Sequence, residues 1–231
     1  MATPTESTSI REQWASRFGN AAPKIVCVGL NYRDHASESS FELPSAPLLF
    51  GKFANTLCGD GDPIILPPGI GHVDAEAELA VVIGSMAESV PEAEALAYVA
   101  GYTCANDVSA RDAQFGDGQW FRGKSYNTFC PVGPRIVLRE ELDVSDLRIQ
   151  QRLNGELLQD SSTRHLIFSV PELVAYVSRV VTLEPGDLIL TGTPEGVGVF
   201  RDPKVTLGDG DVVEVEVEGI GVLRSPVREA S

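Results

Sequence analysis

The apolar residues of this chain occur in short runs separated by turns, and this pattern limits the fold more than any other feature of the sequence. We predict strands over residues 24–30, 63–68, 75–84, 188–190, 212–217 and 221–223. Asn154 and Gly155 lie between two further short runs in residues 148–160, which is typical of a hairpin with a type I′ turn.

Few segments have helical spacing. We predict helices over residues 9–18, 91–99 and 170–181, with Pro91 at a first helical position. Residues 31–46 are polar and irregular, contain little that could anchor them in a core, and indicate a loop or a short helix. Because strands dominate and strands and helices do not alternate regularly, we predict an α+β, β-rich fold rather than a doubly wound parallel sheet.

Charge and composition exclude several classes of partner. The chain has 231 residues and a formal net charge of −15, whereas nucleic-acid binding needs clustered Lys and Arg. No apolar run approaches the ~20 residues of a membrane span, and residues 1–9 do not resemble a secretory signal. We expect a cytoplasmic protein with no nucleic-acid or membrane partner and with reduced, buried thiols at Cys27, Cys58, Cys104 and Cys130.

Paired carboxylates are the first candidate for chemistry. Glu76 and Glu78 are two residues apart in a predicted strand, so their side chains point the same way. Such a pair either binds a hard cation such as Mg²⁺ or Mn²⁺ or forms a solvated acidic face. The same alternation recurs at Glu214, Glu216 and Glu218, where flanking turns indicate an exposed strand, whereas the apolar residues after Glu78 indicate a strand that enters the core. Asp107 either supplies a third carboxylate or marks a turn.

Other polar residues suit binding or catalysis. Lys124 can neutralise a substrate carboxylate, although an isolated Lys is more often at the surface. His35 and Glu38 are neighbours if they share a helical turn, where the carboxylate can orient the imidazole for general-base work, although chance pairs on solvated loops are more common. The glycines of TGTPEGVG (191–198) permit close backbone approach to a ligand, but the segment lacks the Lys-Ser/Thr ending of a phosphate-binding loop.

Taken together and in this order, these segments resemble the fumarylacetoacetate hydrolase family over about residues 24–224. The matching segments are GLNYRDHASE (29–38), EAELAVVIG (76–84), GYTCANDVSARDAQ (101–114), RGKSYNTFCPVGP (122–134), TGTPEGVG (191–198) and LGDGDVVEVEVEGIG (207–221). The resemblance implies a mixed β-sandwich roll, usually dimeric. We expect an N-terminal extension over residues 1–20 and a single catalytic domain over 21–231.

The resemblance also implies a metal site. Carried over residue by residue, Glu76, Glu78 and Asp107 are similar to the three carboxylates with which the family binds Mg²⁺ or Mn²⁺, and Ca²⁺ can replace either ion in crystals. These positions retain the family pattern. Departures from it occur at Ala75, at Asn127 and at residues 164–166, and they bear on the identity of the substrate.

The remaining roles follow from the same resemblance. Lys124 and Gln114 match residues that contact and position the substrate near the metal, and Thr193 matches the threonine that holds a substrate carboxylate. His35 and Glu38 match a dyad on a lid that activates water. We expect the lid, residues 31–47, to close over the metal when a 2-oxo acid binds.

The implied activity is metal-dependent chemistry on a 2-oxo acid through a metal-stabilised enolate. Hydrolytic C–C cleavage of an acylpyruvate such as fumarylpyruvate is the reaction that we expect first. Decarboxylation of oxaloacetate and isomerisation of a 2-hydroxymuconate-type dienoate are alternatives that the same site can support. A catalytically silent protein that binds organic acids or metal is an alternative of another class, but such a protein would have no need of Lys124 or of the His35–Glu38 dyad.

Overall fold

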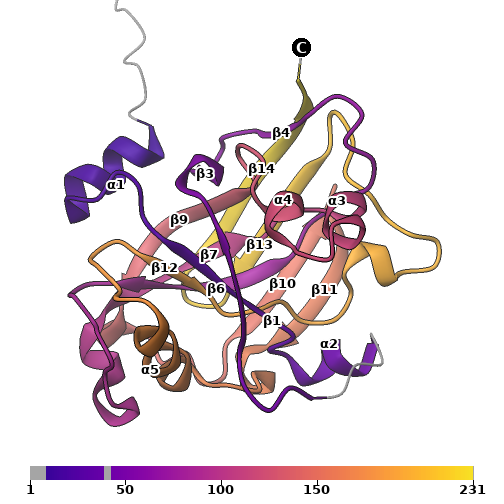
Figure 1. Cartoon of the computed structure of the whole chain (residues 1–231). Coiled ribbons are helices and arrows are strands. Elements are labelled where there is room, and N and C mark those ends of the chain that lie inside the picture. Colours follow the sequence, from indigo (N-terminus) through magenta and orange to yellow (C-terminus); the bar gives the residue numbers. More distant parts are fainter. Residues whose placement is uncertain (1–8, 39–42, 231) are drawn as a thin grey trace, which may run out of the picture.

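Two mixed β-sheets form the body of the molecule (Figure 1). The computed structural model describes residues 9–38 and 43–230. The larger sheet has the strand order β2-β1-β12-β6-β7-β9-β3 and contains β1 (Ile25–Gly29), β2 (Leu48–Lys52), β3 (Leu57–Cys58), β6 (Ala77–Ile83), β7 (Val99–Asn106), β9 (Cys130–Leu138) and β12 (Leu188–Leu190).

The second sheet has the order β11-β10-β13-β14-β4. Its strands are β4 (Ile64–Leu66), β10 (Arg148–Leu153), β11 (Glu156–Ser162), β13 (Val212–Val217) and β14 (Gly221–Glu229). A short ribbon pairs β5 (Val73–Asp74) with β8 (Ser109–Ala110). The predicted β-rich α+β class is therefore confirmed, and β14 runs six residues beyond the predicted end at residue 223.

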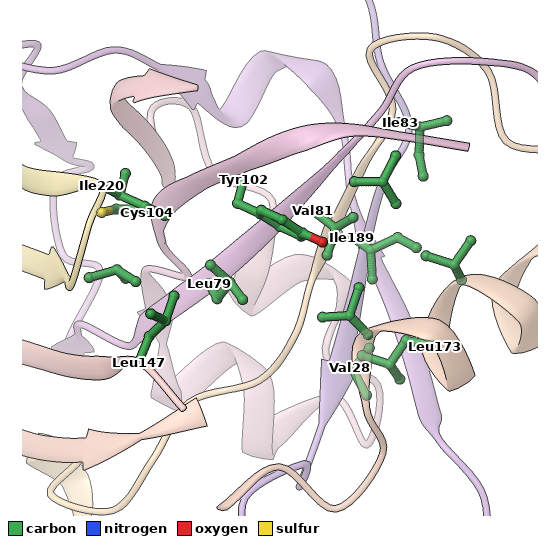
Figure 2. Packing of buried hydrophobic residues seen from close by; sticks show 14 of the residues in the cluster. Val28, Leu79, Val81, Ile83, Tyr102, Cys104, Leu147, Leu173, Ile189 and Ile220 are labelled. Carbon is green, nitrogen blue, oxygen red and sulfur yellow. The ribbon is translucent and has the colours of Figure 1, made fainter. Parts of the chain in front are cut away.

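Strand β6 lies at the centre of the molecule, and all of its side chains are buried. Leu79, Val81 and Ile83 point into the main core, which contains residues from both sheets and from α5 (Figure 2). Ala80 and Val82 belong to a second apolar cluster on the other face of the sheet. A strand that is buried on both faces has apolar residues at successive positions, which explains the sequence that follows Glu78.

The helices begin where the sequence supplies caps. Ser9 caps α1 (Ile10–Phe18) and Ser169 precedes α5 (Val170–Val180), and each forms a capping box with the glutamate three residues later. Both predicted helices are confirmed. The remaining α-helices are α2 (Arg33–Glu38), α3 (Arg111–Gly116) and α4 (Phe121–Lys124), and the 3₁₀ helices are Ala54–Thr56, Glu92–Tyr98, Arg139–Glu141, Thr163–His165 and Gly198–Phe200.

The predicted α-helix over residues 91–99 is wrong in type. The segment is a 3₁₀ helix, and Pro91 precedes it instead of occupying its first helical position. Val99, the residue after the helix, begins β7 and pairs with Ile83 of β6. The segment therefore enters the sheet after a short, tightly wound stretch.

The predicted hairpin is confirmed, because Asn154 and Gly155 have φ values of 53° and 84°, as a type I′ turn requires. The predicted exposure of the late glutamate strand needs correction. Strand β13 lies between β10 and β14, and its valines are buried at every second position. Only the glutamate face turns outward, where Glu214 pairs with an arginine of β14.

The start of the polar segment 31–46 is better anchored than we predicted. Asn31 and Tyr32 are both buried. The Asn31 side-chain amide donates to the carbonyl oxygens of Phe168 (3.1 Å) and Thr191 (2.8 Å), and its Oδ1 accepts from the Phe168 amide at 2.8 Å. Residues 39–42 of the expected lid and the side chain of Glu38 lie outside the described part of the structure.

Across residues 9–38 and 43–230, none of the helices has the length and apolar character that crossing a membrane requires. The four cysteines are buried free thiols, as predicted.

Candidate metal and substrate site

The antiparallel pairing of β6 with β7 brings three carboxylates together. Ala77 pairs with Asn106, so Glu76, just before β6, and Asp107, just after β7, meet at the same end of the sheet. The Asp107 amide donates to the Glu76 carbonyl oxygen at 3.0 Å. Ligand oxygens of Glu76, Glu78 and Asp107 all lie within 4.8 Å of one another, and all three side chains are buried.

Three cationic side chains surround this carboxylate cluster. Lys124 Nζ lies 2.8 Å from both Glu76 Oε2 and Asp107 Oδ2. Arg111 Nη2 lies 2.6 Å from Glu76 Oε1 and 3.1 Å from Oδ2 of Asp74. Lys52 Nζ donates to the second carboxylate oxygen of Asp107. The cluster is thus a nearly balanced group of buried charges, the arrangement in which buried charges are stable.

The sequence assigned no role to Lys52, Asp74 or Arg111. Arg111 is three residues before Gln114, so the two share a helical face, and this spacing could have linked them. Lys52 ends an apolar strand, and its sequence neighbours contain no signal for contact with Asp107. Asp74 also accepts from the amides of Gly198 and Val199, a contact that only the fold reveals.

The surroundings shift the pKa values of the two glutamates in opposite directions. Burial alone would raise the pKa of Glu76, but the adjacent Lys124 and Arg111 outweigh burial and hold it well below its usual value. For Glu78, burial, Asp107 and Glu76 together raise the pKa well above its usual value. Burial lowers the pKa of Lys124, but Asp107 and Glu76 more than compensate, so this ammonium stays charged.

The donor set fits a hard divalent cation. All three candidate ligands are carboxylate oxygens, which Mg²⁺ and Mn²⁺ prefer, and each oxygen has a second lone pair besides the one that accepts a hydrogen bond. Three buried carboxylates this close together repel one another, and a positive charge among them would relieve that repulsion. The backbone amide of Gly192 orients Glu78 by donating to Oε2 at 2.6 Å.

A cavity of about 350 Å³ opens onto the carboxylate cluster. Its lining consists of several apolar residues and of the polar residues Glu76, Glu78, His35, Arg111, Gln114, Lys124 and Thr193. The cavity thus gathers candidate residues from segments far apart in sequence. Gln114 Oε1 accepts from Arg111 Nη1 at 2.8 Å. The Thr193 hydroxyl oxygen accepts from Gln159 Nε2 at 2.9 Å.

Of the two side chains in the predicted dyad, the structure describes only that of His35. His35 belongs to α2, is buried, and lies edge-on to Phe200 with 5.7 Å between the ring centroids. The side chain of Glu38 lies outside the described part, so the dyad stays a prediction.

Comparison with known proteins gives a family match over most of the chain. The fumarylacetoacetate (FAA) hydrolase C-terminal family model matches residues 24–228. "Oxaloacetate tautomerase FAHD2B, mitochondrial" of Bos taurus is 50% identical over 207 residues, which cover 88% of this chain and 66% of the relative. The chain therefore spans slightly less than two thirds of the length of that relative.

Solved structures share the fold. That of a 5-carboxymethyl-2-hydroxymuconate delta-isomerase from Mycobacterium smegmatis has a TM-score of 0.81 and 46% identity, covering 90% of this chain and 79% of that chain. That of a fumarylacetoacetate hydrolase from Exiguobacterium antarcticum has a TM-score of 0.83 and 42% identity, covering 90% and 76%. Both contain the mixed-sheet arrangement described above.

Proposed function

Because this chain belongs to the fumarylacetoacetate hydrolase family, we propose that it is a divalent-metal-dependent enzyme that converts a 2-oxo acid through its enolate. The observation that carries the proposal is the cluster of three buried carboxylates within 4.8 Å, two of which line a cavity together with Lys124, Gln114 and His35. The reaction that this site supports best is hydrolytic C–C cleavage of an acylpyruvate.

Glu76, Glu78 and Asp107 would hold the metal. Bound there, Mg²⁺ or Mn²⁺ would stabilise the negative charge that develops on the 2-oxo oxygen, a contribution of several kcal/mol. Lys124 places a fixed positive charge beside the same point and so attracts the substrate carboxylate into an otherwise acidic protein.

Gln114 and Thr193 can orient the substrate because of the hydrogen bonds that they already make. Arg111 donates to Gln114 Oε1, so the Nε2 group of Gln114 is the part that can donate to a substrate carbonyl. Gln159 donates to the Thr193 hydroxyl oxygen, so the hydroxyl hydrogen can be donated to a substrate carboxylate.

His35 is the group suited to activate water. Its imidazole lines the cavity and can take a proton from a water that attacks the carbonyl carbon remote from the carboxylate. The C–C bond then breaks, its electron pair passes to the pyruvate enolate, and protonation gives pyruvate and a carboxylic acid.

The test is pyruvate release from an acylpyruvate such as acetylpyruvate by the purified protein. We expect activity with Mg²⁺ or Mn²⁺, loss after EDTA treatment, and recovery when the metal is restored. Calorimetry with Mg²⁺ alone would show one site per chain. Undiminished activity in EDTA, in protein shown by elemental analysis to be metal-free, would contradict the proposal.

The name of the bovine relative supports a second candidate, keto–enol tautomerisation of oxaloacetate. This reaction moves a proton between C3 and the 2-oxo oxygen and needs no attacking water. Decarboxylation of oxaloacetate and isomerisation of a dienoate also pass through an enolate of a 2-oxo acid, each through its own. Enol absorbance, CO₂ release and pyruvate release, measured side by side on the metal-loaded protein, distinguish these reactions.

A further inference from the structure

A buried glutamine joins the second sheet to the polar lining of the cavity. Gln159 lies on β11, and its side chain is fully buried. Its Nε2 group donates to the Thr193 hydroxyl oxygen at 2.9 Å and to the Pro194 carbonyl oxygen at 2.8 Å, and its Oε1 accepts from the Ala77 amide at 2.9 Å. Thr193 lines the cavity, and through it Gln159 can influence a ligand that it does not touch.

Only one orientation of the Gln159 amide satisfies these partners. The Ala77 N–H can only donate, so it faces Oε1, and the Pro194 carbonyl can only accept, so it faces Nε2. The second hydrogen of Nε2 then points at the Thr193 hydroxyl oxygen. The two backbone groups therefore fix the direction of this hydrogen bond, in which Thr193 is the acceptor.

This direction determines how the Thr193 hydroxyl meets a ligand. A hydroxyl group has one hydrogen and two lone pairs, and its hydrogen cannot bond to a group that is itself donating. Gln159 occupies one lone pair, so the hydrogen of Thr193 is directed elsewhere. Toward the cavity, Thr193 can therefore act as a hydrogen-bond donor.

The segment 191–198, which contains Thr193, is held against both sheets. A Cβ added at Gly196 would lie 2.2 Å from the Leu158 carbonyl oxygen of β11, so only glycine allows this close approach. The Thr191 amide and hydroxyl both donate to the Leu79 carbonyl oxygen of β6, at 3.0 and 2.9 Å. The position of the donor is thus set by contacts on β11 and β6.

We infer that Gln159 is a positioning residue that makes Thr193 a hydrogen-bond donor to the substrate carboxylate. The inference rests on the proposed function, in which Thr193 meets that carboxylate. Because Ala77 lies between Glu76 and Glu78, the Gln159 amide also ties this donor to the chain segment of two candidate metal ligands. A carboxylate has no hydrogen to donate, so a hydroxyl with a directed hydrogen is its matching partner.

A double-mutant cycle tests whether Gln159 acts through the Thr193 hydroxyl. Gln159→Met keeps the length of the side chain and removes its hydrogen bonds, and Thr193→Val keeps the shape of Thr193 without the hydroxyl. Calorimetry with saturating Mg²⁺ gives the dissociation constant of oxalate, an unreactive mimic of the 2-oxo acid head. We expect Gln159→Met to weaken oxalate binding at least about 5-fold when the Thr193 hydroxyl is present, and less than about 2-fold in the Thr193→Val protein.

Gln150→Met is the matched control. Gln150 is a buried glutamine of the neighbouring strand β10, and its Oε1 accepts from Arg152 at 3.0 Å. Because Gln150 bonds Arg152 and not Thr193, its replacement should change oxalate affinity less than about 2-fold in either background.

Steady-state kinetics with acetylpyruvate give a second readout. The substrate carboxylate is held alike before and during the reaction, so Gln159→Met should raise KM and leave kcat within about 3-fold. A fall in kcat with unchanged KM would mean that Gln159 does not act on carboxylate binding, and would overturn the inference.

Gln159→Glu replaces Gln159→Met in the cycle if the methionine variant does not fold, as judged by circular dichroism and Mg²⁺ binding. It keeps the shape of the side chain and the oxygen that accepts from Ala77, while its other oxygen would accept the Thr193 hydrogen. The direct effect of the added charge is similar in both backgrounds and cancels in the cycle. The same coupling between positions 159 and 193 is expected.

The unmodified protein separates this inference from the proposed function. If it binds oxalate with Mg²⁺ but the replacement of Gln159 costs the same affinity in both backgrounds, Gln159 is only a structural support, and the proposed function stands. If it does not bind oxalate in the presence of Mg²⁺, the proposed function fails and the inference fails with it.

Discussion

Glu76 and Glu216 stand in similar alternating sequences but meet opposite surroundings. Glu76 is buried between Lys124 and Arg111, whereas the Glu216 side chain is 44% exposed and pairs with a surface arginine. The apolar residues after Glu78 were enough to predict that the strand of Glu76, and not that of Glu216, enters the core. The cations that make burial tolerable come from distant parts of the chain, so no local pattern predicted all of them.

We therefore predict that Glu76→Ala lowers Mg²⁺ affinity by at least about 100-fold, a larger loss than removal of a residue that only supports a ligand. It should also destabilise the fold by about 3–5 kcal/mol, because Lys124 and Arg111 remain buried without this partner. Calorimetry and urea unfolding measure the two effects. Glu216→Ala is the matched control, and similar affinity losses in both variants would contradict the assignment.

Gly192 has a backbone conformation that favours glycine, and its amide donates to Glu78 of the carboxylate cluster. Its φ is 101°, and an added Cβ would lie 2.9 Å from Asn31 Cβ and 3.1 Å from the Val28 carbonyl oxygen. Gly210 has a φ of 85° with no atom that a Cβ would meet within 4 Å. Both glycines therefore have a positive φ, but an added Cβ would clash with neighbouring atoms only at Gly192.

Gly210→Ala should cost about 1 kcal/mol for the left-handed backbone alone. Gly192→Ala should cost a further ~1–3 kcal/mol for the clash. Because the Gly192 amide orients Glu78, only the Gly192 variant should also weaken Mg²⁺ binding. Equal stability and unchanged metal affinity in the two variants would show that close packing at Gly192 is unimportant.

At the scale of elements, the sequence predicted best where signals are local. The caps at Ser9 and Ser169 and the Asn154-Gly155 turn each act within a few residues, and the two helices and the turn were predicted, although the caps themselves were not. Strands β2, β7 and β9 were not predicted as strands, because glycines and prolines interrupt their apolar runs. Their places depend on pairing with distant strands, which a local pattern does not contain.

Helix α2 brings His35 to the cavity, and this placement leads to a prediction about catalysis. Removal of a general base usually lowers a rate by about 10²–10⁴-fold. We expect His35→Ala to reduce acylpyruvate hydrolysis by that factor and to leave Mg²⁺ affinity nearly unchanged, since His35 is not among the three clustered ligands. Oxaloacetate decarboxylation, which needs no activated water, should suffer less.

His165→Ala is the control for this variant, because His165 lies outside the cavity. Steady-state rates and calorimetry on both proteins give the comparison. If His35→Ala retains full hydrolytic activity, His35 is only a wall of the cavity. If both variants lose activity equally, the loss is not specific to His35 and does not identify it as a general base.

At the scale of the whole molecule, we propose that two copies of the chain associate. Strand β2 is an edge of the larger sheet, and Leu48, Phe53 and Phe121 are exposed on or near it. Phe53 and Phe121 touch each other, with 5.0 Å between the ring centroids, so the apolar surface is continuous. Exposed apolar edges of this kind are normally covered. Light scattering should give the mass of a dimer at micromolar concentration, and a monomer throughout this range would refute the proposal.

The four buried thiols give the fold a dependence on alkaline pH. Burial raises the pKa of Cys104 from 9.0 to about 12, and that of Cys130 likewise. Burial also raises the pKa values of Cys27 and Cys58. Between pH 9 and 12 the unfolded chain therefore releases thiol protons that the native protein keeps. Native protein binds more protons in this window, so stability is full below pH 9 and falls as pH rises.

Each thiol should cost about 1.4 kcal/mol of unfolding free energy at pH 10, as its proton is lost only on unfolding. Urea unfolding at pH 8, 9 and 10 measures the decline. Cys104→Ala removes one thiol and keeps every other titrating group, so between pH 9 and pH 10 its unfolding free energy should fall by about 1 kcal/mol less than that of the unmodified protein. The absolute stability of the variant does not matter, because the readout is the slope. Parallel slopes for the two proteins would mean that the Cys104 thiol ionises as readily inside the fold as outside it.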